Sequence, residues 1–246
     1  MCLPNVLELG VLRKDYAPLK DLIDIFLDPS SVLSRQREEA RWWLPLMLLV
    51  VSAAAVTYLF LGKVDSAWLI EQQILNSGED VSEQQLAAIR GASPGGSFVI
   101  WSSTIGSAIM VATVMALFGG FFMLAGKFSK TDFTFKHGLT LASWSQMPTL
   151  INTLLMLIGV LSMSPQTSLE SLSLTSLNAL FLDLPADDPW YSFATTFSVL
   201  VPWTIVLAAL GWKLWSGATR WTAPLLIATL PHFIIYGAMA IWAMTR

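Results

Sequence analysis

Residues 98–126 read FVIWSSTIGSAIMVATVMALFGGFFMLAG and contain no Asp, Glu, Lys or Arg. At a rise of about 1.5 Å per residue, a helix of this length extends roughly 43 Å, which exceeds the about 30 Å hydrocarbon core of a bilayer. Surface helices of soluble domains carry a polar face along their length, and this stretch has none. It therefore predicts a transmembrane helix.

Four further stretches of about 20 residues lack Asp, Glu, Lys and Arg as well: 43–61, 141–163, 193–212 and 223–244. Hydroxyl and amide side chains dilute the third and fourth of the five spans and blur their ends: Thr140, Ser143, Ser145 and Gln146, then Thr195, Thr196 and Ser198. We expect an all-α fold, a polytopic membrane helical bundle with about five transmembrane helices.

The composition supports this expectation and excludes several other classes of protein. Hydrophobic residues make up 54% of the 246 residues and charged residues only 13%, against about 25% charged in soluble domains. The net charge of -3 and the lack of a basic stripe argue against nucleic acid as a partner. A single cysteine, Cys2, excludes an intrachain disulfide and a site of several thiolates, and no cofactor is expected.

The positive charges predict the orientation of the bundle. Eleven of the fourteen Lys and Arg residues fall before the first span or in the loops after the second and fourth: Arg13, Lys14, Lys20, Arg35, Arg37, Arg41, Lys127, Lys130, Lys136, Lys213 and Arg220. Short cytoplasmic loops carry an excess of Lys and Arg. We therefore expect a cytoplasmic N-terminus and a C-terminus that is periplasmic or outside.

The segment before the first span is expected to form two short helices. Residues 19–27 place apolar side chains at helical spacing between charged ones, and Asp28 followed by Pro29 is typical of an N-cap and the first position of a helix. A second helix should therefore cover residues 29–41. Residues 1–41 would form a cytoplasmic amphipathic segment, and residues 42–246 the five-helix transmembrane domain.

Two outer loops also carry helical patterns. Residues 164–189 space six apolar side chains along one helical face, which fits an amphipathic helix on the outer interface; a plain linker packed over the bundle is the alternative. In the loop between the first and second spans, Asp80 and Glu83 have the spacing of a capping box, so a short helix should end near Gly91.

Most catalytic motifs are absent from the sequence, including the phosphate-binding loop, H-E-x-x-H, G-x-S-x-G and C-x-x-C. His232 follows Pro231 in the fifth span and is the only histidine in the five predicted spans. An ionisable group at membrane depth is a functional candidate by default. The alternative is a neutral imidazole bonded to a backbone carbonyl that the proline frees.

Two sets of residues in the spans are candidates for binding or packing. The first is a polar seam or lipid path between the second and third spans, with interhelical hydrogen bonding as the alternative: Ser103, Ser107, Gln146, Asn152 and His232. The second is a stripe of small side chains at a spacing of four residues, expected to be a packing seam within the chain or a homodimer contact: Thr104, Ala108, Ala112, Ala116 and Gly120.

Several short segments resemble the bacterial branch of the Yip family (Ypt-interacting proteins). They are the entry Ile25-Phe26-Leu27-Asp28-Pro29-Ser30, the run Phe118-Gly119-Gly120-Phe121, and residues 142–148 with a proline in the third span. The resemblance implies a five-helix domain in a bacterial inner membrane with a cytoplasmic N-terminus. It implies no residue motif for an activity, and the Rab GTPases linked with eukaryotic members have no bacterial counterpart.

The leading hypothesis is a non-enzymatic inner-membrane protein that organises lipid or a partner protein, with membrane lipids as its expected partners. A homo-oligomer or a partner membrane protein is the further possibility for its contacts. The first alternative is a passive transporter or lipid flippase with a polar path between the second and third spans. The second is an intramembrane enzyme that uses His232 as acid or base, although the neighbouring sequence offers no carboxylate or nucleophile.

Overall fold

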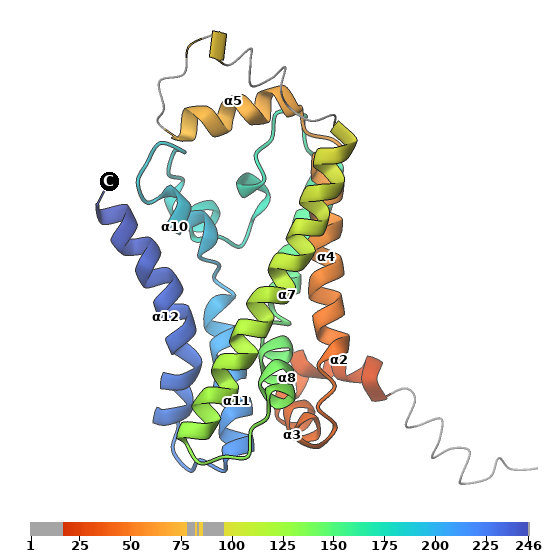
Figure 1. Ribbon diagram of the computed structural model, residues 1–246, viewed down its shortest axis with the longest axis vertical. Coiled ribbons are helices and arrows are strands. Elements are labelled where there is room, and N and C mark those ends of the chain that lie inside the picture. Colours follow the sequence, from red (N-terminus) through yellow and green to blue (C-terminus); the bar gives the residue numbers. More distant parts are fainter. Residues whose placement is uncertain (1–16, 78–81, 83, 86–95, 246) are drawn as a thin grey trace, which may run out of the picture.

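The computed structural model describes residues 17–77, 82, 84–85 and 96–245, and within them the chain is a bundle of helices (Figure 1). The helices are α2 (Ala17–Leu27), α3 (Pro29–Glu39), α4 (Trp43–Leu61), α5 (Ser66–Ser77), α7 (Gly96–Phe128), α8 (Phe135–Ser145), α9 (Thr149–Ser162), η1 (Glu170–Leu172), η2 (Asn178–Leu182), α10 (Tyr191–Thr196), α11 (Val201–Ser216) and α12 (Thr222–Met244). The predicted all-α class is confirmed.

Three helices are long and apolar enough to cross a membrane, namely α4, α7 and α12. They match the predicted spans 43–61, 98–126 and 223–244. The count rises to four if α8 and α9 form one span, which is bent by 51° at its break. The predicted count of five is therefore not confirmed.

The third and fourth predicted spans are broken helices. Between α8 and α9 the break falls just before Pro148, whose ring and missing N–H disrupt a helix. The prediction of one continuous helix over 193–212 is wrong, because α10 ends at Thr196 and the backbone is extended at Phe197. Helix α11 then begins at Val201, with Pro202 in its first turn, where proline is tolerated.

The predicted amphipathic helix over 164–189 is also wrong, and the alternative of a linker packed over the bundle holds. This segment contains only short turns, η1 and η2, and its Leu172 is buried against Val160 of α9. The apolar side chain of Leu172 is thus buried although the segment forms no regular amphipathic helix. The predicted capping box of Asp80 and Glu83 and the helix end near Gly91 lie outside the described residues.

The two predicted entry helices are confirmed as α2 and α3, although α3 ends at Glu39 rather than at residue 41. The carboxylate of Asp28 accepts a hydrogen bond of 3.3 Å from the Ser31 backbone N–H, as an N-cap does. A buried network joins the helices: Asp21, 2% exposed, accepts from Arg35 at 2.5 Å and from Gln36 at 3.0 Å. Such a carboxylate is tolerable in the interior because it is paired.

One end of the bundle contains the largest core and most of the Lys and Arg residues, and is called the basic end below. Helices α2 and α3 and the loops 129–134 and 217–221 lie at this end (Figure 1). Two buried indoles fix α3 and the turn between α3 and α4 to the other helices. Trp215 Nε1 donates to the Leu33 carbonyl at 2.6 Å, and Trp144 Nε1 donates to the Arg41 carbonyl at 3.1 Å. Buried Trp side chains usually need such a partner.

The closest approach between α7 and α8 is made by two glycines, Gly119 and Gly138. A Cβ atom on Gly138 would collide with the carbonyl oxygen of Gly119, and one on Gly119 would lie 3.0 Å from the backbone of Leu139. The buried residues of α7 are accordingly Met115, Gly119, Phe122 and Gly126. This face is different from the predicted stripe of small residues.

The stripe itself is only partly covered within one chain. Thr104, Ala108 and Ala112 are half-buried and Ala116 is exposed. A Cβ atom added to Gly120 would find nothing within 4 Å. The α7–α8 seam lies one residue before the stripe, because spacing does not determine which face of a helix meets a given neighbour. The stripe as a packing seam or a homodimer contact stays a prediction.

The two glycines offer a matched test of the packing. Gly138→Ala should lower the thermal unfolding temperature of the detergent-solubilised protein by about 3–10 °C, because overpacking costs about 1–3 kcal/mol. Gly120→Ala makes the same chemical change in open space, and alanine is the better helix former. Equal unfolding temperatures for the two variants would contradict the α7–α8 contact.

Candidate functional site

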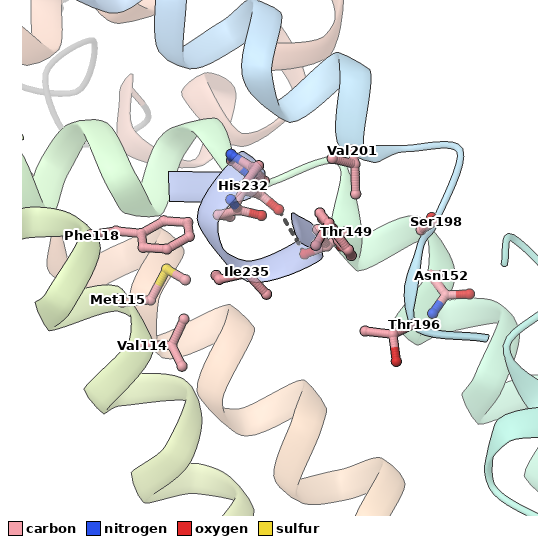
Figure 2. Close-up of a pocket in the computed structure, with 12 residues that line it drawn as sticks. Val114, Met115, Phe118, Thr149, Asn152, Thr196, Ser198, Val201, His232 and Ile235 are labelled. Atoms are coloured by element: carbon pink, nitrogen blue, oxygen red, sulfur yellow. Dashed lines mark hydrogen bonds between the residues drawn. The ribbon is translucent and has the colours of Figure 1, made fainter. Parts of the chain in front are cut away.

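A cavity of about 270 Å³ with polar and apolar lining residues lies where the two helix breaks meet α7 and α12 (Figure 2). It is called the central cavity below. Its polar lining residues are Gln146, Thr149, Asn152, Thr196, Ser198, His232 and Tyr236. Its apolar lining residues are Val114, Met115, Phe118, Val201 and Ile235. None of the described lining residues is Asp, Glu, Lys or Arg, so the cavity suits an uncharged polar group.

Helix geometry places the central cavity well inside the span of the long helices. His232 is ten residues beyond the start of α12 at Thr222, which corresponds to roughly 15 Å. Val201 is twelve residues before Lys213 on α11, or roughly 18 Å. Half of a hydrocarbon core is about 15 Å. The cavity therefore lies near the middle of the bundle, far from both of its ends.

At the break between α10 and α11, backbone groups that lack a helical partner bond to the linker, residues 164–189. The Leu177 N–H donates to the Phe197 carbonyl at 2.8 Å, and the Val199 N–H donates to the Thr175 carbonyl at 2.9 Å. Ser176 and Ser198 form an isolated antiparallel bridge. Because a lipid environment offers no hydrogen bonds, non-helical backbone at this depth needs partners of this kind.

Asn152 of α9 connects both segments of this bridge. Its side-chain oxygen accepts from the Thr175 hydroxyl at 2.8 Å, and its amide nitrogen donates to the Ser173 hydroxyl at 3.3 Å. The Thr175 hydroxyl lies 2.9 Å from the Ser198 hydroxyl. The polar side chain of α9 thus holds the linker and the helix break in place, and its own hydrogen-bonding groups are largely used.

Gln146 presents the opposite case. It stands in the break between α8 and α9 and lines the cavity, yet its side-chain amide makes no hydrogen bond within the described part of the chain. An amide supplies two donors and one acceptor. Gln146 is therefore a lining residue whose polar groups are available to a bound molecule, as are the hydroxyls of Thr196 and Tyr236, which also make no hydrogen bond within the described part of the chain.

His232 is held by its own helix. Its Nδ1 lies 3.2 Å from the Ala228 carbonyl, and because a carbonyl only accepts, Nδ1 carries the hydrogen. Its Nε2 is 3.5 Å from the Thr204 hydroxyl, which already donates to the Val201 carbonyl at 2.9 Å. The carbonyl partner belongs to Ala228 rather than to Ile227, the carbonyl four residues before Pro231. The expected carbonyl-bonded imidazole is thus present with a different partner.

The structure brings together three of the five residues predicted for the polar seam. Gln146, Asn152 and His232 line one cavity, whereas Ser103 and Ser107 do not. Ser103 is eleven residues from Val114 along α7, which is roughly 16 Å toward the end away from the basic residues. The Ser107 hydroxyl donates to the Thr104 carbonyl of its own helix at 2.9 Å.

The contribution of α10 and of the residues after it was not predicted from the sequence. Thr196, Ser198 and Tyr236 line the cavity although none was a candidate. A signal for two of them was present, because Thr195, Thr196 and Ser198 interrupt an otherwise apolar span. Of these hydroxyls, that of Ser198 contacts the linker at Thr175, whereas that of Thr195 donates to carbonyls of its own helix.

The fold and the central cavity define a helical membrane protein with a polar interior site. The Yip1 domain family model matches residues 23–243, nearly the whole chain. The protein belongs to the Yip1 domain family, as the resemblance implied. Comparisons with curated proteins and with solved structures give no significant match.

The role of Asn152 can be tested by hydrogen exchange. Asn152→Ala removes the partner of Thr175 and Ser173, a loss of about 1–2 kcal/mol. Amide exchange of residues 173–177 and 197–200 should become about five- to thirtyfold faster. Thr153→Ala is the matched control, because the Thr153 hydroxyl bonds only to the Thr149 carbonyl of its own helix. Equal exchange in both variants would show that Asn152 does not hold the linker.

Proposed function

We propose that this protein is a non-enzymatic bacterial inner-membrane protein that binds membrane lipid in the central cavity and thereby organises lipid around the bundle. The observation that carries the proposal is an uncharged polar cavity, half-way along the long helices, that contains the free amide of Gln146. A polar group at that depth is costly unless it binds something polar. In a bilayer, the abundant molecules with uncharged polar groups and apolar tails are lipids.

The size and the surroundings of the cavity support a lipid as the occupant. Its volume of about 270 Å³ is below the about 300–1,000 Å³ of sites that enclose a small molecule. It therefore holds part of a larger molecule, such as the ester and glycerol region of a lipid. Ile235, 43% exposed, lines its edge beside the exposed Phe233 and Ile234, so acyl chains would lie against an apolar outer face of α12.

The lipid hypothesis is tested with a phospholipid that carries a photoactivatable group next to its glycerol. Labelling of the protein in vesicles should fall several-fold in Gln146→Leu, which keeps the volume of the side chain and removes its amide. Ser103→Ala, outside the cavity on α7, should label like the parent protein. Unchanged labelling of the Gln146 variant would refute binding in the central cavity.

A passive transporter or lipid flippase remains the second candidate, and one observation favours it. Gln146 and Asn152, two of the four residues predicted for such a path beside Ser103 and Ser107, line the cavity at the two helix breaks, an arrangement that solute-binding helices of transporters also use. The two candidates differ in one measurement. Movement of a fluorescent lipid between leaflets of the same vesicles, lost in Gln146→Leu and kept in Ser103→Ala, would favour transport over static binding.

The proposed orientation places the basic end in the cytoplasm and the C-terminus outside. The support is that nine of the ten Lys and Arg residues in the described part of the chain lie at one end of the bundle: Lys20, Arg35, Arg37, Arg41, Lys127, Lys130, Lys136, Lys213 and Arg220. Membrane lipids are the proposed partners. Association with a second copy or another membrane protein would use surfaces such as the partly covered small-residue stripe of α7.

The orientation predicts the outcome of reporter fusions. A reporter that is active only outside the cytoplasm should give signal when it is fused after Asp187 and none when it is fused after Lys130. The reverse pattern would invert the bundle. Signal at both positions would mean that the chain between them does not cross the membrane as an odd number of spans.

A further inference from the structure

A second cavity, of about 400 Å³, lies at the basic end and is called the basic-end cavity below. It forms where the end of α3, the loop between α7 and α8, and the end of α11 meet. Four charged side chains line it: Arg37, Glu38, Lys130 and Asp132. It shares no lining residue with the central cavity, so its function is a separate question.

The charges of the basic-end cavity are balanced but not paired. Two are cationic and two are anionic, and none of the four is in an ion pair within the part of the chain that the structure describes. Their neighbours differ, since Arg35 pairs with Asp21 and Arg41 with Glu39. Both signs of charge therefore remain available around one cavity.

The wall of the cavity is tied together by hydrogen bonds and ring contacts. His137 Nε2 lies 3.2 Å from the Arg37 carbonyl, and its Nδ1 accepts from the Thr134 backbone N–H at 3.3 Å. Phe133 and Trp215 are buried with ring centroids 5.9 Å apart. The Ser216 hydroxyl is buried there and has no hydrogen-bond partner among the described residues.

The neighbourhood of the cavity places it at the depth of lipid headgroups. Phe128 and Phe135 stand on either side of the loop 129–134 and are 88% and 44% exposed. Such exposure of large apolar rings is unfavourable in water and favourable at a membrane surface. Trp221, with the Lys213 ammonium 5.4 Å from its ring, lies in the next loop of the same end.

We propose that the basic-end cavity binds the zwitterionic headgroup of a phospholipid with a primary ammonium group, as in phosphatidylethanolamine. Arg37 and Lys130 bind the phosphate, and Glu38 and Asp132 accept hydrogen bonds from the ammonium. A purely anionic headgroup would meet two uncompensated carboxylates. A quaternary ammonium group has no N–H to donate to them.

The test compares three lipids with identical acyl chains, namely phosphatidylethanolamine, phosphatidylcholine and phosphatidylglycerol. Native mass spectrometry of the full chain in detergent measures the fraction that retains each lipid. Phosphatidylethanolamine should be retained most, and Lys130→Gln and Asp132→Asn should each lower its retention about two- to fivefold, as expected for exposed charges. Lys127→Gln and Asp187→Asn are the matched controls and should leave it unchanged, because neither residue lines the cavity.

Several outcomes would overturn the proposal. Equal retention of phosphatidylethanolamine and phosphatidylcholine would remove the role of the carboxylates. Tightest retention of phosphatidylglycerol, increased by Asp132→Asn, would show an anion site instead. If soluble glycerophosphoethanolamine bound as tightly as phosphatidylethanolamine, the ligand would be a soluble phosphoethanolamine compound rather than a membrane lipid. Gln146→Leu should leave the lipid preference intact, which separates this site from the central cavity.

Discussion

Hydrogen bonding of the backbone inside lipid is the constraint on which the rest of this structure depends. A helix satisfies its own N–H and carbonyl groups, so every break in a helix at membrane depth needs an external partner. At the break between α10 and α11, the linker supplies that partner through Thr175 and Leu177. Asn152 then holds the linker, and the central cavity forms beside this arrangement. The central cavity is thus a consequence of how the backbone N–H and carbonyl groups at the helix break find hydrogen-bond partners.

The two ends of the bundle are stabilised in different ways. At the basic end, close packing comes from the Gly119–Gly138 contact and from three buried tryptophans, Trp144, Trp212 and Trp215. The indole N–H groups of Trp144 and Trp215 donate to carbonyls of the segment before α4. Around the linker at the opposite end, the core is smaller and rests on residues such as Phe60, Val160 and Leu172. Dense packing at one end holds α8 and α11 in place while their continuations separate around the cavity.

The sequence predicted those elements whose signal is local. Hydropathy predicted α4, α7 and α12, and the pair Asp28–Pro29 predicted the start of α3. Gln146, Asn152 and His232 were found as candidates because polar side chains stand out in apolar spans. The break at Phe197 and the inclusion of Ser198 were missed, since they depend on hydrogen bonds to a distant linker. Ser103 and Ser107 were wrongly grouped with the others because composition carries no information on depth along neighbouring helices.

The central claim is that the break between α10 and α11 lies inside the hydrocarbon core. A spin label on Val199→Cys, in a Cys2→Ser background, measures this depth directly, and Val199 is suitable because its side chain is 39% exposed and its backbone makes the contact with Thr175. The prediction is strong relaxation by oxygen and weak relaxation by a water-soluble nickel chelate, as for a site roughly 18 Å from the level of Lys213. Relaxation mainly by the nickel chelate, as at the headgroups, would contradict the claim.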